Sequence, residues 1–371
     1  HPLIKTGGLA DVAGSLPCAL RELGQDARLI IPAYPRAVKR TRDLRTLCDL
    51  RVPGARLPVR ILGGTLPDSA LPVYLVEAPE HFCREGNPYT DMSGRDWGDN
   101  AERFLLFCRV IAHLAEGLDA LEWRPDVLHC NDWQTGLAPA LLHRNPGRPA
   151  TAFTIHNLAY QGLFDYKTFK TLELPTHWWS MEAMEFHDRF SFIKGGLIFA
   201  DWLTTVSPTY AKEILGPEYG MGLERRLRER HGSVIGILNG VDYEEWSPES
   251  DTLIPNTYTS EDLAGKEKNK QSLMAEVGLD YRIDRPLVGM VTRLTYQKGI
   301  ELVQQALPDL MRKKDFSLVA LGSGEHDYEQ FFEWLIREFP GRAAFHRGFN
   351  NALAHRIEAG SDLFLMPSRY E

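Results

Sequence analysis

Apolar runs of strand length alternate with longer amphipathic stretches along most of the chain, and this alternation constrains the fold more than any other feature. It is typical of α/β units, in which a helix returns the chain to the start of the next parallel strand. The predicted fold class is therefore α/β. In open sheets of this kind the functional groups gather beyond the carboxyl ends of the strands, where the unusual residues of this sequence fall.

The predicted strands form two series. The first series comprises residues 27–35, 72–79, 125–132, 150–157 and 200–207. The second follows a polar, loop-rich stretch and comprises residues 286–293, 316–324, 343–349 and 362–371. Between them, residues 232–242 are predicted to form a strand that ends in a turn, which makes them a candidate hinge. We expect two domains, at residues 1–238 and 239–371.

Composition excludes several classes of partner. The 371 residues are 43% apolar and 25% charged, an ordinary balance for a soluble globular protein. The formal charge is −8 and the 42 basic residues form no long run, so no nucleic-acid partner is expected. No apolar run approaches the roughly 20 residues that a membrane helix needs, so no membrane partner is expected either.

The cysteines favour a reducing compartment. They are odd in number, widely spaced and without a CxxC pair, at positions Cys18, Cys48, Cys83, Cys108 and Cys130. We therefore expect a cytoplasmic, bacterial protein. Because the chain begins at His1 in a loop-like segment, a lost targeting peptide, and with it a plastid location, stays open.

The first motif that carries chemistry is KTGGLADVAGSL at residues 5–16. Gly7 and Gly8 permit close backbone approach, and the helix that follows presents free N–H groups to an anion beside Lys5. The motif is not a Walker phosphate loop, because the lysine precedes the glycines. A plain turn before a helix is the alternative interpretation.

The second motif is MVTRLTYQKGIELVQQAL at residues 290–307. Arg293 and Lys298 lie between a predicted strand and a predicted amphipathic helix, so both cations can reach one ligand. Fixed cations stabilise a diphosphate leaving group more in the transition state than in the ground state. The alternative is a solvated pair at a helix entrance.

The third motif, ALGSGEHDYEQFF at residues 320–332, resembles a dinucleotide-binding turn only in part. Asp327 stands where the third glycine would be, and Glu325 adds a second negative charge at the helix start. A pyrophosphate would be repelled there, which argues against a nicotinamide-dependent dehydrogenase. A nucleoside lying over the loop and a plain strand-to-helix turn both stay open.

Polar side chains follow two strands of the first series. Asp132 ends one strand, and His156 and Asn157 end the next. Carboxylate, imidazole and amide together can hold the hydroxyls of a hexose, and His156 could stabilise a positively charged anomeric centre through its backbone or its ring. A packed or capping histidine is the alternative, and a metal pair with His129 lacks a third ligand.

Two further observations concern charge. Glu371 follows the last predicted strand and could accept hydrogen bonds from a sugar, or could be an ordinary loop residue. The chain contains no Asp-x-Asp pair, which many metal-dependent sugar-nucleotide enzymes use to bind the diphosphate through a divalent ion. We therefore expect no metal and no other cofactor, with lysine and arginine in the place of the metal.

Six motifs occur together in one order, and in that order the chain resembles bacterial glycogen synthases and plant starch synthases. The motifs are KTGGLADV, HCNDWQTG, TIHNLAYQG, NGVD, TRLTYQKG and PSRYE, and the resemblance covers essentially the whole chain. It implies the GT-B arrangement, in which two Rossmann-like domains face each other across an active-site cleft. Residues 1–238 would be the starch synthase catalytic, acceptor-side domain and residues 239–371 the nucleotide-binding domain.

The resemblance also implies roles for individual residues. Lys5 and Asp11 match positions near the diphosphate and the donor, and Arg293 and Lys298 match the cationic pair on the diphosphate. The remaining matches are the glucose-site positions Asp132, His156 and Asn157, the cleft tyrosine Tyr89, the NGxD residues Asn239 and Asp242, and the glutamate near the transferred sugar, Glu371.

The reaction implied is transfer of glucose from ADP-glucose to an α-1,4-glucan, with release of ADP and retention of the anomeric configuration. The partners are thus the sugar nucleotide and the α-glucan acceptor. UDP-glucose stays open as the donor, and the oligomeric state is not readable. The alternatives are a related GT-B transferase with another acceptor and a catalytically silent glucan-binding homologue.

The ends of the chain depart from the family pattern. Members begin with a short strand before the lysine loop and continue past the glutamate through a further loop and strands. We therefore expect the first sheet to lack its opening strand and the second domain to be incomplete. The expected consequence is that this exact polypeptide, tested alone, shows no turnover.

Overall fold

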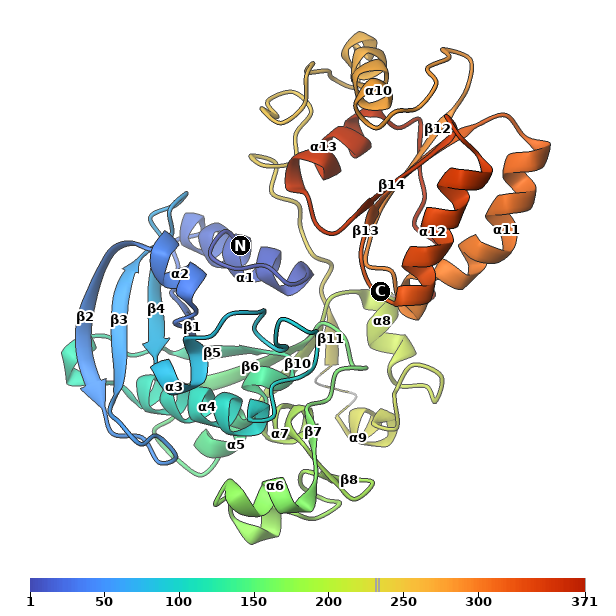
Figure 1. The fold of residues 1–371 in the computed structure, drawn as a ribbon. Helices are drawn as coiled ribbons and strands as arrows, with labels where there is room; N and C mark the ends of the chain where they lie inside the picture. Colours follow the sequence, from blue (N-terminus) through green and yellow to red (C-terminus); the bar gives the residue numbers. More distant parts are fainter. Residues whose placement is uncertain (231, 233, 371) are drawn as a thin grey trace. The chain divides into compact units, whose positions relative to one another are not determined.

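The computed structural model describes residues 1–230, 232 and 234–370. The chain divides into two compact units, His1–Asn239 and Gly240–Glu371 (Figure 1). Each unit has its own sheets and helices, and each is described by itself. Glu371, one of the predicted site residues, lies outside the described residues.

The parallel sheet of the first unit positions most of the predicted sugar-binding residues. Its order is β11-β10-β6-β5, and each neighbouring pair is parallel. The strands are β5 (Val127–Asn131), β6 (Ala150–Ile155), β10 (Trp202–Thr205) and β11 (Val234–Gly236). Asn131 is level with Thr154, so the loops after β5 and β6 leave the same edge of the sheet side by side. The sequence predicts β5, β6 and β10, and the structure confirms them.

A second sheet in this unit is mixed rather than parallel. Its order is β1-β4-β3-β2, with strands β1 (Leu29–Pro32), β2 (Arg42–Leu50), β3 (Val59–Thr65) and β4 (Pro72–Glu77). The pair β1–β4 is parallel, whereas β3 is antiparallel to both of its neighbours. The sequence pattern does not predict β2 and β3, because β2 is a largely exposed, polar edge strand and β3 carries Gly63 and Gly64, which are typical of turns.

Helices surround these sheets. The helices of the first unit are α1 (Gly8–Glu22), α2 (Pro35–Arg40), α3 (Pro79–Phe82), α4 (Asn100–Glu116), α5 (Leu137–Leu142), α6 (Tyr166–Thr171), α7 (Phe192–Phe199), α8 (Pro208–Glu213) and α9 (Glu224–Glu229). Helix α4 packs against α5, which packs in turn against α7. A small antiparallel sheet, β7 (Leu163–Phe164), β9 (Arg189–Ser191) and β8 (Glu185–Phe186), lies beside α6.

The second unit is a parallel sheet between two helical layers. Its order is β14-β13-β12-β15, with strands β12 (Leu287–Val291), β13 (Ser317–Gly322), β14 (Ala343–Arg347) and β15 (Leu363–Phe364). The helices are α10 (Ala264–Glu276), α11 (Ile300–Lys313), α12 (His326–Glu338) and α13 (Asn351–Gly360).

The central strand of the second unit separates two hydrophobic cores. Leu318 and Ala320 belong to the core that contains Ile300 of α11. Val319 and Leu321 belong to the other core, with residues of α10 and α13. Because successive side chains of a strand point to opposite faces, β13, which is buried at every residue, requires a helical layer on both faces.

No helix within the described residues is long and apolar enough to cross a membrane.

Phe153 offers a test of the core of the first unit. It is fully buried on β6, and its ring packs against the backbone of α7 at Gly196, where a Cβ would collide with it. Phe153→Ala should lower the free energy of unfolding by about 3–5 kcal/mol, because a cavity remains when a buried aromatic ring is removed. Urea unfolding followed by circular dichroism measures this, with Val127→Ala on neighbouring β5 as the control, since Val127 is 59% exposed. Equal losses in the two variants would contradict the packing described here.

Candidate active site

Asp132 connects the ends of two neighbouring strands. Its peptide N–H donates to the carbonyl of Thr154 at 3.0 Å, which extends the β5–β6 pairing by one residue. Its carboxylate accepts a hydrogen bond from the peptide N–H of His156 at 2.8 Å. Asp132 has a φ of 54°, a left-handed conformation that few residues other than glycine adopt. Strain of this kind persists only where surrounding bonds hold it, and it occurs frequently in functional sites.

Burial changes the protonation of both groups. Burial raises the pKa of Asp132 to about 7, although the peptide N–H groups of His156 and Asn157 act in the opposite direction. Burial also lowers the pKa of His156 to about 4, with a smaller contribution from His129. A neutral imidazole and a carboxyl group that titrates near neutrality therefore stand side by side.

The ring of His156 is held across the two strands. Its Nε2 lies 3.0 Å from Oδ1 of Asn131, the last residue of β5. Because an amide oxygen can only accept, the neutral ring carries its proton on Nε2 and leaves Nδ1 as an acceptor. His129 is occupied elsewhere, with Nε2 at 2.6 Å from the hydroxyl of Thr154.

Tyr89 approaches the same group from a different loop. Its ring packs against Phe104 at a centroid distance of 6.2 Å, and Phe104 packs in turn against Trp133, the residue after Asp132. Burial raises the pKa of Tyr89 to about 12, with an added contribution from the charge of Asp132. The structure therefore brings Tyr89, Asp132 and His156 together. Asn157 has a different visible role, since its Oδ1 accepts the peptide N–H of Ala159 at 3.0 Å and shapes the loop after β6.

The KTGGLADV motif leaves the start of α1 open. A Cβ added at Gly7 or at Gly8 would meet nothing within 4 Å, and Gly7 has an extended φ of 175° that any residue adopts. Neither glycine is therefore required by the packing of this unit. A small residue at a helix N-terminus leaves its peptide N–H groups accessible to an anion. Lys5 is ion-paired with Asp11 at 2.7 Å, so two predicted binding residues contact each other directly.

In the second unit, two of the predicted motifs are bonded to one another through Gln297. Its side-chain oxygen lies 3.3 Å from a guanidinium nitrogen of Arg293, and its amide nitrogen donates to the carbonyl of Tyr370 at 3.2 Å. Its backbone carbonyl accepts the peptide N–H of Arg369 at 2.9 Å. TRLTYQKG and the described part of PSRYE therefore form one structure, and Lys298 ends the short 3-10 turn beside it.

Gly299 makes this close approach possible. Its φ of 67° is left-handed, and a Cβ there would collide with the carbonyl oxygen of Pro367. The guanidinium of Arg369 lies 4.5 Å from the ring centroid of Tyr296 and forms an ion pair with Glu301 of α11. These contacts hold the segment that precedes Glu371 against the start of α11.

The glycines of the third motif have a packing role. A Cβ at Gly322 would meet the carbonyl of Thr292, and one at Gly324 would meet that of Leu294. The peptide N–H of Leu294 donates to the carbonyl of Ser323, and the carbonyl of Leu294 accepts from Glu325, both at 2.9 Å. The loop that carries Arg293 is therefore fixed against the residues that follow β13. A nucleoside over this loop stays a prediction.

The NGVD element spans the division between the units. Asn239 is exposed and ends the first unit, whereas Asp242 lies in the second. The carboxylate of Asp242 accepts the peptide N–H of Glu244 at 3.0 Å, and its carbonyl accepts that of Trp246 at 2.8 Å, so it shapes the turn that follows. Within the described residues no group of three metal-ligating side chains is present.

The sequence patterns do not single out two residues that the structure places in these clusters. Asn131 orients His156, and Gln297 connects the two motifs of the second unit. Both lie inside quoted motifs, but their uncharged side chains do not distinguish them from their neighbours there.

Comparison with known proteins assigns the fold and the family. The chain matches the family described as starch synthase catalytic domain over residues 1–229 and the family described as glycosyl transferases group 1 over residues 280–371. It is 50% identical over 371 residues to glycogen synthase 2 of Nitrosococcus oceani, covering 100% of this chain and 75% of that relative. It is 49% identical over 374 residues to the glycogen synthase of Thioalkalivibrio sulfidiphilus, with 100% and 77% coverage.

A solved structure agrees with this match. The catalytic domain of starch synthase IV from Arabidopsis thaliana, bound to ADP and acarbose, is similar with a TM-score of 0.87 and 33% identity, covering 100% of this chain and 76% of that chain. The fold is thus that of a GT-B glycosyltransferase. The chain belongs to the family of glycogen synthases and starch synthases, glucosyltransferases that extend glucan chains.

The raised pKa of Asp132 predicts a pH-dependent stability. Its pKa is about 7 in the folded protein against an ordinary value of 3.8, so the folded state favours the protonated form. The stability that this group contributes is complete below pH 4 and is lost as the pH rises through about 7. We measure the free energy of unfolding by urea between pH 4 and pH 8. As the pH rises, the value for Asp132→Asn should increase relative to that of the unchanged protein by up to about 1.4 kcal/mol per pH unit.

The control for this experiment is Asp68→Asn, which removes one negative charge from an exposed position in the same unit. Its stability should run parallel to that of the unchanged protein over the whole pH range. The same parallel course for Asp132→Asn would contradict the buried state of its carboxyl group.

Proposed function

We propose that this glucosyltransferase uses ADP-glucose as donor, extends α-1,4-glucan chains with retention of the anomeric configuration, and releases ADP. The observation that carries the proposal is the buried Asp132 beside the partly buried His156 at the carboxyl ends of β5 and β6, with Tyr89 near them, in a chain that belongs to this family throughout its length. The ADP and acarbose bound to the similar Arabidopsis domain support the choice of nucleotide and of an oligosaccharide acceptor.

The diphosphate would be held by cations and by peptide N–H groups. Arg293 and Lys298 follow the carboxyl end of β12, where open α/β sheets bind their ligands. Lys5 and the open start of α1 are the matching groups of the first unit, and Lys5 would exchange its ion pair with Asp11 for one with the more highly charged diphosphate. Cations fixed before the reaction stabilise the charge that develops on the leaving diphosphate.

The glucosyl group would lie against the first unit. Asp132, His156 and Asn157 supply acceptors and donors for its hydroxyls, with Tyr89 as the wall beside them. A neutral His156 places no repulsive charge near an anomeric carbon that becomes positive in the transition state. Glu371 and Asn239 belong to the same proposal on the family match alone.

The proposed reaction uses neither a metal nor another cofactor, and no residue of the chain acts as a covalent nucleophile. The bond from the anomeric carbon to the diphosphate oxygen breaks, and the acceptor hydroxyl attacks from the same face. The leaving phosphate takes the proton of that hydroxyl. We include a cytoplasmic location in the proposal because all five cysteines are free.

Donor choice is the direct test of this proposal. The full-length protein should release nucleotide and lengthen glycogen with ADP-glucose, and should do so much more slowly with UDP-glucose. Nucleotide release and the length of labelled glucan chains are measured with each donor in parallel. A preference for UDP-glucose would overturn the nucleotide assignment, and elongation with neither donor would favour the catalytically silent homologue.

Lys298→Ala tests the proposed diphosphate contacts. Removing one fixed cation should lower kcat by about 10²–10³-fold, because a preorganised group that stabilises transition-state charge is lost. The matched control is Lys313→Ala at the far end of α11, which is exposed and removes the same charge. Circular dichroism verifies that both variants are folded, and an unchanged kcat in Lys298→Ala would remove the proposed role.

A further inference from the structure

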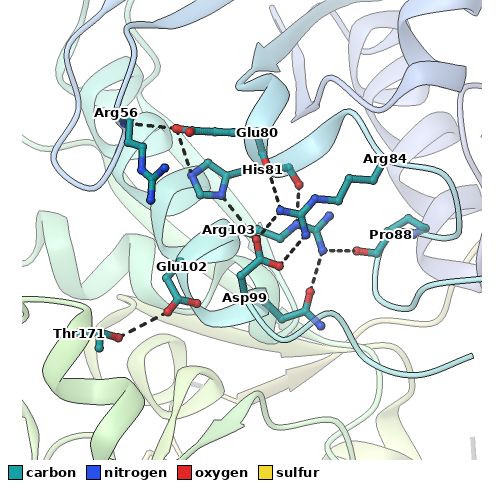
Figure 2. A network of polar contacts seen from close by, with 10 residues as sticks. Arg56, Glu80, His81, Arg84, Pro88, Asp99, Glu102, Arg103 and Thr171 are labelled. Atoms are coloured by element: carbon teal, nitrogen blue, oxygen red, sulfur yellow. Dashed lines mark hydrogen bonds and ion pairs between the residues drawn. The ribbon is translucent and has the colours of Figure 1, made fainter.

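Arg103 is the most deeply buried charged residue of the first unit, with an exposed fraction of 1%. It lies on α4, and its guanidinium donates to three oxygens of the neighbouring loop and helix start (Figure 2). The acceptors are the carbonyl of His81 at 2.7 Å, the carbonyl of Pro88 at 3.2 Å and Oδ1 of Asn100 at 2.7 Å. A buried cation is retained only where such bonds compensate for its loss of water.

These bonds lead directly to Tyr89. Pro88 precedes it, and Asn100, which Arg103 orients, donates from its side-chain amide to the carbonyl of Tyr89 at 3.0 Å. The carbonyl of Tyr89 also accepts the peptide N–H of Trp97 at 3.0 Å. The carbonyls of Pro88 and Tyr89 thus both accept hydrogen bonds from side chains of α4. Without these donors they would be unpaired polar groups at a buried position.

A second residue of α4, Phe104, contacts both the Tyr89 loop and the loop that carries Asp132. Phe104, the next residue after Arg103, packs its ring against Tyr89 at 6.2 Å and against Trp133 at 4.9 Å. Trp133 directly follows Asp132. Helix α4 therefore carries the Tyr89 loop and the Asp132 loop on adjacent residues, and a change in the anchoring of one loop alters its distance from the other.

An ion pair closes the outer side of this loop. Arg84 and Asp99 form two hydrogen bonds, one of them between Nη1 and Oδ1 at 2.6 Å, which joins the two ends of the loop that carries Tyr89. Figure 2 shows this pair beside Arg103. Burial by itself raises the pKa of Asp99, but the nearby His81 and the hydrogen bonds and charge of Arg84 bring that pKa well below the usual range, so Asp99 is ionised. Its charge also compensates for that of Arg103.

We propose that Arg103 is a positioning residue for glucosyl transfer, and that it acts through Asn100 and the Pro88–Tyr89 backbone to hold the ring of Tyr89 against Phe104, next to the loop that carries Asp132. The inference rests on the proposed function, because it takes Tyr89 as part of the sugar site. Arginine is suited to this role, since its planar fork can satisfy several carbonyls at fixed angles, which a lysine ammonium cannot.

The chain provides a matched control on the same helix. Arg109 lies on α4 as well, is partly buried, and donates to two backbone carbonyls, those of Pro53 at 2.8 Å and Leu172 at 3.0 Å. Burial lowers the pKa of both arginines. Arg109 anchors loops away from Tyr89, so Arg109→Met has a similar effect on stability with no path to the sugar site.

The test is a double-mutant cycle in the full-length protein. Arg103→Met should lower kcat/KM for ADP-glucose by about tenfold to a hundredfold, since displacement of a site residue by about 1 Å has effects of this size. In a Tyr89→Ala background the same substitution should change kcat/KM less than about twofold, because the group through which it acts is gone. Arg109→Met should leave kcat/KM unchanged in both backgrounds.

A second measurement does not depend on turnover. 3-Fluorotyrosine placed at position 89 reports the ionisation of its phenol by ¹⁹F NMR. The buried phenol has a raised pKa, and release of the loop should lower it towards the ordinary value in Arg103→Met but not in Arg109→Met. If the unchanged protein transfers no glucose, the proposed function fails while this titration still tests the positioning of Tyr89.

Equal loss of kcat/KM from Arg103→Met in both backgrounds, or a phenol pKa that does not move, would overturn the positioning role. If Arg103→Met does not fold, Arg103→Lys replaces it in the same cycle. Lysine keeps the charge and loses the fork, so its effect should also vanish in the Tyr89→Ala background.

Discussion

The parallel pairing of β5 with β6 is the constraint on which the sugar site of this protein depends. Parallel neighbours place their carboxyl ends at one edge, so Asp132 and His156 meet although 24 residues separate them. The hydrogen bond between the Asp132 carboxylate and the His156 peptide N–H then fixes the two loops together. Burial of the two side chains at this edge shifts both towards their neutral forms, although the hydrogen bond itself acts in the opposite direction on the pKa of Asp132.

The second unit uses the same principle with different chemistry. Its cationic loop follows the carboxyl end of β12 and is confined by the glycines after β13 and by the segment that precedes Glu371. Gln297 joins these parts through an uncharged side chain, while Arg293 and Lys298 supply the charge. Each unit therefore holds its polar groups by bonds between loops that leave one edge of a parallel sheet.

Helix α4 shows how a buried charge can serve a site that it does not touch. A well-packed apolar residue in place of Arg103 would avoid the cost of burying a cation, but it would leave the carbonyls of His81 and Pro88 without donors. Arg103 therefore fixes the Tyr89 loop at some cost in the stability of the folded protein. Phe104 adds apolar contacts with Tyr89 and Trp133. The hydrogen bonds of Arg103 therefore orient the Tyr89 loop, and the packing of Phe104 sets its distance from the Asp132 loop.

The sequence by itself determined the α/β class, most of the strands and the candidate residues, because strand and helix periodicity and ordered motifs are local properties of the chain. It missed β2 and β3, whose polar edge and glycine pair resemble loops. Only the tertiary structure decided that Lys5 pairs with Asp11, that Gln297 joins two motifs, and that α4 carries the Tyr89 loop. These contacts join residues that lie apart along the chain or depend on side-chain direction, and neither property is encoded in a local pattern of residue types.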